Sequence, residues 1–84
     1  MNREEVIAGV VEVIHRLAGT DETLVTLEAS LVDDLDLDSL AMAEIGVALE
    51  DRFGVVIPDS EIARFKTVAE LVEFISARTP QNPS

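Results

Sequence analysis

The stretch from Val32 to Asp51 most constrains what this chain can form. It holds seven carboxylates and no basic residue, and its second half carries apolar residues at helical spacing. Acidic residues are favourable at the start of a helix, because exposed backbone N–H groups and the helix dipole make that end positive. We therefore expect a helix that begins near Asp38 or Ser39 and ends before Gly54. Such a start would hold Ser39 at an exposed corner, beside N–H donors that favour a phosphate group.

This expected second helix is apolar on two sides, so each side needs an apolar surface to pack against. The side that suits a buried stripe carries Met42, Ile45, Leu49 and Phe53. The other side carries Leu40, Ala43 and Val47, flanked by Glu44, Glu50 and Asp51. We predict that the first side faces the core and the second faces a partner. The alternative is a solvated acidic surface, which is what most charged runs are; the apolar residues between the charges argue against it.

The chain before this helix predicts one more helix and a long loop. Apolar residues recur at spacings of three and four over residues 3–18, with Asn2 as the N-cap and Gly19 as the C-cap. Residues 20–37 fit neither period, and a loop of this length must be held down or serve a function. We expect its leucines to hold it against the helices, with a short helical turn inside it. These leucines are Leu24, Leu27, Leu31 and Leu35.

The chain after the second helix predicts a connector and two further helices. Residues 55–58 are apolar, but a single strand would have no partner, so we predict an extended connector. Asp59 is expected to cap a short helix that carries Ile62 and Phe65, and Thr67 with Glu70 forms a capping box for a final helix. The apolar positions of that helix are Val68, Leu71, Val72 and Ile75. Residues 78–84 are expected to be a frayed tail.

The predicted fold class is therefore all-α, a four-helix bundle of three main helices and one short helix, with a long first loop. The 84 residues predict a single domain, residues 1–84, and 48% of them are hydrophobic, which excludes a disordered acidic tail. The net charge of −11 argues against nucleic acid and membrane surfaces, favours partners with basic patches, and favours a monomer through self-repulsion. Without a leader segment or an apolar run of spanning length, we expect a cytoplasmic protein.

The residues indicate no metal centre and no catalytic constellation. The chain has no cysteine, and its one histidine, His15, has no second histidine to share a metal ion. Asp34, Asp36 and Asp38 alternate like the first ligands of a calcium loop, but the twelfth position of that loop, which requires glutamate, is Ile45. We therefore expect a solvated acidic loop that binds divalent cations loosely. The clustered carboxylates lie on an exposed loop and helix face, which does not separate their environments for acid–base catalysis.

The run Asp38-Ser39-Leu40, the acidic helix after it and the later Ile57-Pro58-Asp59 resemble an acyl carrier protein. The resemblance covers about residues 3 to 77. The longer run from Val32 to Leu40 is especially similar to the free-standing actinobacterial carriers of type II fatty acid synthesis, including the mycolate-linked ones.

This resemblance implies that Ser39 carries 4′-phosphopantetheine through a phosphodiester, and that the arm's thiol holds acyl groups as thioesters. Separate enzymes would do the chemistry, so the protein itself would not be an enzyme. The implied partners are a holo-carrier synthase (a phosphopantetheinyl transferase), acyltransferases, ketosynthases and reductases with basic docking patches. The implied recognition surface consists of Asp38, Leu40, Glu44, Val47, Glu50, Asp51, Val56 and Ile57. An apolar cleft between the helices would shelter the acyl chain.

Several other functions remain open at this level. A carrier for type II polyketide or non-ribosomal peptide synthesis fits the same pattern, although peptidyl carriers are usually less acidic. An acidic calcium-responsive module is disfavoured by Ile45. An adaptor whose acidic helix occupies a basic groove would leave Ser39 as an ordinary helix cap.

Overall fold

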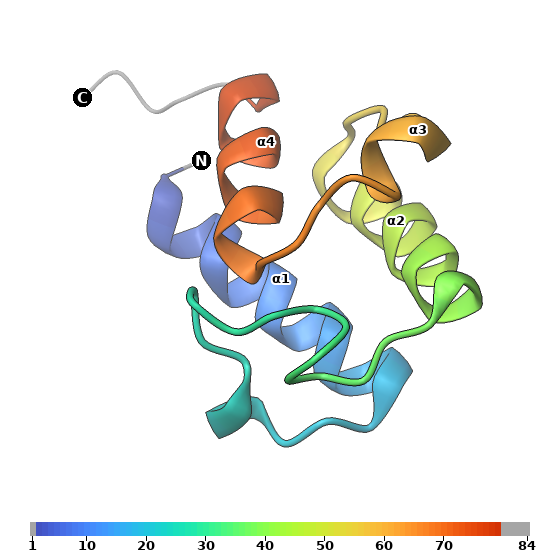
Figure 1. Ribbon diagram of the computed structural model, residues 1–84. Helices are drawn as coiled ribbons and strands as arrows, with labels where there is room; N and C mark the ends of the chain where they lie inside the picture. The colour runs from blue at the N-terminus through green and yellow to red at the C-terminus, as the bar shows by residue number, and fades with distance from the viewer. Residues whose placement is uncertain (1, 80–84) are drawn as a thin grey trace.

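Helix α1 (Arg3–Ala18) is the helix against which α2, α4 and a short 3-10 helix all pack. In the computed structural model, which describes residues 2–79, it crosses the molecule with α4 and α2 on either side of it (Figure 1). The Asn2 side chain accepts the Glu5 N–H at 2.9 Å, and Gly19 ends the helix with a left-handed backbone (φ 72°). The prediction for residues 3–18 is confirmed.

The long loop between α1 and α2 runs across the lower end of the molecule in Figure 1. It contains the short 3-10 helix η1 (Glu22–Leu24), capped by Asp21. The Thr23 N–H and hydroxyl both donate to the Asp21 carboxylate, which lowers the pKa of Asp21 below its usual value. Leu31 and Leu35 are buried and Leu27 is half-buried, as expected of residues that hold the loop in place. The prediction is wrong for Leu24, which is 58% exposed.

Helix α2 (Ser39–Phe53) presents its predicted inner side to the core. Met42, Ile45 and Leu49 are buried, and Phe53 is half-buried against them. Gly54 ends the helix with φ 66°, a backbone conformation that glycine adopts without steric cost. Both the extent of α2 and its buried stripe are confirmed.

The connector over residues 55–58 is extended and belongs to no strand, as predicted. Helix α3 (Asp59–Ile62) follows it, but Asp59 does not cap the helix as predicted. Pro58 holds the cap position, and its carbonyl accepts the N–H groups of Glu61 and Ile62 at 2.9 and 3.1 Å, so the helix starts one residue early. The helix also ends at Ile62, so Phe65 lies beyond it.

Helix α4 (Val68–Arg78) begins with the predicted capping box. The backbone N–H groups of Lys66 and Thr67 donate to the Glu70 carboxylate, which lowers the pKa of Glu70. The predicted tail is wrong at its first two residues, since Arg78 is helical and Thr79 is buried with its N–H bonded to the Ile75 carbonyl at 2.9 Å. Residues 80–84 of that predicted tail lie outside the described residues.

The loop and the helices are joined by a backbone contact beside α4. Ser30 and Thr67 form an isolated antiparallel bridge, and the Leu31 N–H donates to the Lys66 carbonyl at 2.8 Å. With four α-helices and no named strand in residues 2–79, the predicted fold class is confirmed. Within the same residues, no helix is both long enough and apolar enough to cross a membrane.

Candidate functional site

Ser39 is the first residue of α2 and is exposed. The residue before it, Asp38, has an extended backbone, and its Oδ1 accepts the Ala41 N–H at 2.8 Å. Because this bond satisfies an N–H group that the helix itself leaves free, the chain turns from loop to helix at Asp38. Ser39 is therefore held at the corner where the sequence predicted it.

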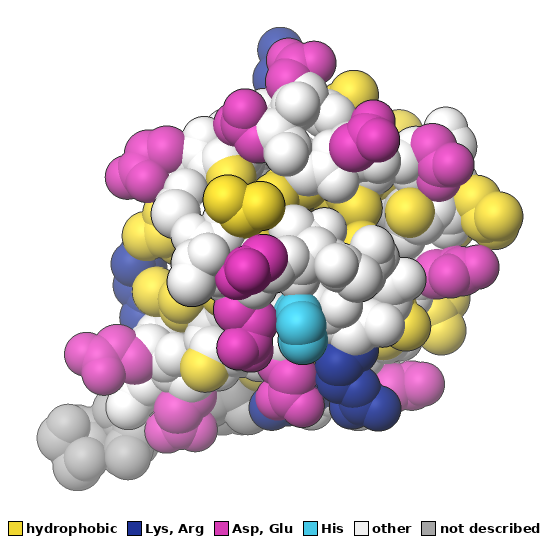
Figure 2. Space-filling view, turned by 90° about the horizontal axis from the view of Figure 1, so that it is seen from below, with side chains coloured by type: hydrophobic (Ala, Val, Ile, Leu, Met, Phe, Trp, Pro, Cys, Tyr) yellow, Lys and Arg dark blue, Asp and Glu magenta, His cyan; other side chains and the backbone are white. Residues whose placement is uncertain are grey.

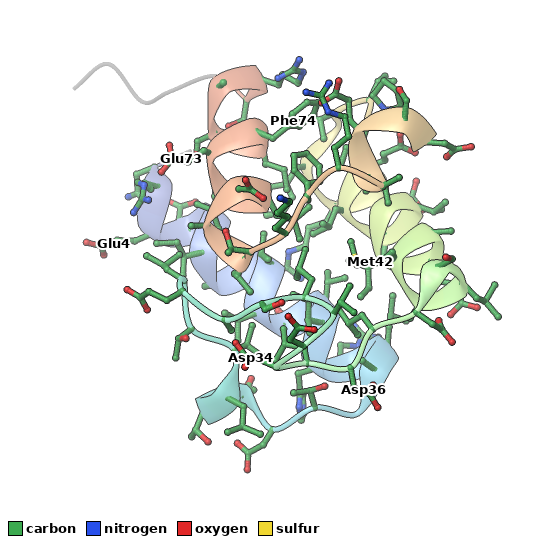
Figure 3. All side chains as sticks on the ribbon, viewed as in Figure 1. Glu4, Asp34, Asp36, Met42, Glu73 and Phe74 are labelled. Atoms are coloured by element: carbon green, nitrogen blue, oxygen red, sulfur yellow. The ribbon has the colours of Figure 1, made fainter. Side chains whose placement is uncertain are left out.

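The loop leading to Ser39 alternates between buried leucines and exposed aspartates. Leu35 and Leu37 are 5% and 3% exposed, whereas Asp36 and Asp38 are exposed. Asp36 has a left-handed backbone (φ 56°), and Figure 3 shows it on the loop at the lower edge of the molecule. The two leucines thus anchor the loop in the core and leave the aspartates in solvent on the approach to Ser39.

Two of the aspartates before Ser39 accept backbone hydrogen bonds. Asp34 Oδ2 accepts the Ser30 N–H at 2.7 Å, and Asp38 caps α2. Across residues 2–79, no three His, Cys, Asp or Glu side chains are grouped closely enough to hold a metal ion. The exposed His15 lies near the end of α1, and its Nδ1 is 2.7 Å from the carbonyl oxygen of Thr20 at the start of the loop. Asp34 and Asp38 therefore stabilise the loop and the start of α2.

One side of α2 carries alternating apolar and acidic residues in a single line. Leu40, Glu44, Val47 and Asp51 follow one another at helical spacing, so they share one side of the helix, which we call the outer face of α2. All four are exposed, with Leu40 at 68% and Val47 at 59%. Val56, in the connector after α2, is 74% exposed. These five residues and Asp38 are exposed, so six of the eight predicted recognition residues are accessible to a partner.

Two of the predicted recognition residues serve the fold instead. Ile57 is only 4% exposed, so the prediction that it belongs to an exposed surface is wrong. Glu50 is half-buried, and its Oε2 accepts the Ile57 N–H at 2.6 Å, which fixes the connector against the end of α2. Successive residues of an extended segment point to opposite sides, so the exposure of Val56 could have indicated the burial of Ile57.

The charge of the surface is consistent with a partner that carries basic groups. Figure 2 shows acidic side chains spread over one face, with hydrophobic side chains between them and basic side chains gathered in few places. The arginine at the end of α2, Arg52, forms an ion pair with Glu12 of α1 at 3.0 Å. Because Arg52 is paired with a carboxylate of α1, it does not neutralise the carboxylates on the outer face of α2. The negative potential of that face therefore extends into the solvent.

A cavity of about 530 Å³ lies beside Ser39, between α2, α3 and the loops that flank them. Its lining includes three exposed polar residues, Asp38, Ser39 and Asp59. The other lining residues are apolar: Val32, Leu37, Met42, Ala43, Ile62, Ala63 and Phe65. Figure 3 shows Met42 on the inner side of α2. The sequence analysis assigned Met42 and Ile62 to packing and did not identify Val32 or Ala63 as lining residues. The cavity combines residues of loops and of two helices, and no periodic pattern in the sequence relates these segments.

Comparison with known proteins matches most of the chain to one family. A family model described as a phosphopantetheine attachment site covers residues 8–75. That range runs from the first turns of α1 to the last turn of α4, so it spans the whole bundle rather than one motif.

Several curated relatives match the chain almost from end to end. The meromycolate extension acyl carrier protein of Mycobacterium leprae is 45% identical over 83 residues, which cover 99% of this chain and 72% of the relative. The protein of the same name from Mycolicibacterium smegmatis is 47% identical over 81 residues, covering 96% and 82%. The acyl carrier protein of Acidothermus cellulolyticus is 44% identical over 79 residues, covering 94% of each chain. Identity at this level over nearly the whole bundle places the chain in the acyl carrier protein family.

Proposed function

We propose that Ser39 carries 4′-phosphopantetheine and that the protein delivers the acyl groups held there to fatty acid synthesis enzymes. The family supplies the carrier role, and one observation supports Ser39 as the attachment site. Ser39 is exposed at the start of α2 and also lines the apolar cavity. Ser60 of α3 is exposed as well, but it does not line that cavity.

The start of α2 fits a phosphodiester. Helix N-termini favour anions through their free N–H groups and the helix dipole. Attachment would join the Ser39 Oγ to the phosphorus of an activated donor such as coenzyme A, with loss of the hydroxyl proton and cleavage of the donor's phosphoanhydride bond. When attached, the group supplies a terminal thiol that holds acyl groups as thioesters.

The cavity favours an aliphatic cargo over a polyketide. Seven of its ten lining residues are apolar and offer no side-chain donor or acceptor to a keto or hydroxyl group, and the three polar ones, Asp38, Ser39 and Asp59, are all exposed. A buried polar group without a hydrogen bond costs free energy, commonly about 1–3 kcal/mol in proteins. Fatty acyl chains need no such partners, so polyketide and peptidyl carriers are the second choice. Because two of the relatives are named for meromycolate extension, elongation of long acyl chains is the first pathway to test.

The outer face of α2, with Asp38 and Val56, is the docking surface in this proposal. Carboxylates at its rim would steer enzymes with basic patches, and Leu40 and Val47 would supply apolar contact at its centre. The partners are the holo-carrier synthase, acyltransferases, ketosynthases and reductases, and they perform all the chemistry. The protein itself acts as a cytoplasmic, monomeric carrier and not as an enzyme.

The test is the mass of the protein after incubation with a holo-carrier synthase and coenzyme A. The natural chain should gain one phosphopantetheine group, whereas Ser39→Ala should gain none and should keep its helical circular dichroism. Alanine favours the helix, and Asp38 rather than Ser39 provides the cap. Ser60→Ala is the matched control and should be modified like the natural chain. Modification of the Ser39→Ala protein would refute the assignment.

A further inference from the structure

Gly46 leaves a notch in the side of α2 that faces α3. A Cβ atom placed on Gly46 would lie 2.8 Å from Ile62 Cδ1 and 3.1 Å from Ile62 Cγ1. The first distance is shorter than carbon atoms in proteins adopt, so the Ile62 side chain occupies space that any other residue at position 46 would fill. The absence of a side chain at Gly46 therefore leaves room for this placement of Ile62, and backbone freedom is not the reason for the glycine, since it lies inside α2.

The same contact anchors α3. This helix has four residues, no side-chain cap, and a single buried residue, Ile62, which is 7% exposed. A helix so short gains little stability from its own hydrogen bonds. Its position against α2 consequently depends on how Ile62 sits in the notch at Gly46.

Ile62 is also part of the cavity wall next to Ser39. Along α2 the cavity is lined by Ser39 and then, one turn further, by Met42 and Ala43. Gly46 comes one turn after these, about 10 Å along the axis from Ser39, yet it does not line the cavity. Ile62 covers it and forms the wall at that depth.

We propose that the contact between Gly46 and Ile62 sets the length of acyl chain that the cavity accepts. This inference rests on the proposed attachment at Ser39. A short chain fits above Ile62, whereas a longer chain has to push this side chain out of the notch and loosen α3. Removing part of Ile62 deepens the cavity, and adding a methyl group at position 46 pushes Ile62 into it.

The experiment measures the melting temperature of the full chain loaded at Ser39 with straight acyl groups of increasing length. For the natural chain, the melting temperature should rise with chain length and stop rising at one length. Ile62→Ala should move that limit to chains longer by about two to three carbons, because it removes three side-chain carbons. Gly46→Ala should move the limit toward shorter chains.

Ile57→Ala is the matched control, since Ile57 is also a buried isoleucine next to α3 but does not line the cavity. It should lower all melting temperatures and leave the limit unchanged. If Ile62→Ala unfolds, Ile62→Val removes one carbon and should move the limit in the same direction by less. Loaded variants whose limit equals that of the natural chain would overturn this inference alone, whereas a natural chain that gains no arm would overturn the proposed function with it.

Discussion

Asp36 provides the sharpest test of the loop geometry before Ser39, because it is the one non-glycine residue in residues 2–79 with a positive φ, 56°. We compare Asp36→Gly with Asp36→Ala, two variants that remove the same charge. A left-handed backbone costs alanine about 1–2 kcal/mol. Glycine avoids that cost but loses roughly 0.5–1 kcal/mol more conformational entropy on folding. The difference predicts that the glycine variant is the more stable by about 0.5–1 kcal/mol.

The assay is urea and thermal unfolding of both variants, followed by circular dichroism in one buffer. For a domain of this size, a difference of about 1 kcal/mol corresponds to roughly 4–8 °C in melting temperature. Asp33 supplies the control, since it is an exposed aspartate of the same loop without a positive φ. Asp33→Gly should be less stable than Asp33→Ala, the reverse order. An Asp36→Gly protein no more stable than Asp36→Ala would refute the reasoning.

Two further predictions concern docking and pH. Glu44→Lys should slow phosphopantetheine transfer, and high salt should reduce the deficit, because exposed charges act on association rate; Glu28→Lys, an equal charge change outside α2, should be nearly silent. Val47→Asp should slow transfer at any salt concentration, because it places a charge in the apolar centre of the contact. Equal transfer rates for the Glu44→Lys, Glu28→Lys and Val47→Asp proteins would argue against a docking face. The folded-state pKa of Glu70 is lowered from 4.5, so its contribution to stability is present above pH 4.5 and is lost as the pH falls through the folded value. The melting-temperature difference between the natural chain and Glu70→Gln should accordingly shrink in acid, and a difference that stays constant with pH would contradict this assignment.

The structure also decides which control suits the docking experiment. In the sequence, Glu12 of α1 is equivalent to Glu44, since both are helical glutamates. In the fold, Glu12 lies 3.8 Å from Arg16 and 3.0 Å from Arg52. A lysine there would be the third cation of the group and would disturb the contact between α1 and α2. Glu28 forms no ion pair among the described residues, so its reversal changes the net charge without that effect.

The helices and the position of Ser39 could be predicted from the sequence, because local interactions determine both. A side chain that caps a helix bonds to N–H groups two or three residues away, so Asn2, Asp38 and the pair Thr67 and Glu70 mark their helix starts directly. Apolar spacing then predicts which side of each helix is buried. The prediction failed at α3, where the backbone of Pro58 began the helix before the expected cap at Asp59.

The cavity and the true extent of the docking surface depend on contacts between residues far apart in the chain. Nothing near Ile57 in the sequence shows that Glu50 binds its N–H group, and nothing near Gly46 shows that Ile62 fills the space beside it. Such contacts depend on side-chain shape, since closely packed interiors leave room only where two particular surfaces fit. The sequence by itself therefore determined the helices and the candidate attachment residue, and only the tertiary structure decided what space lies next to it.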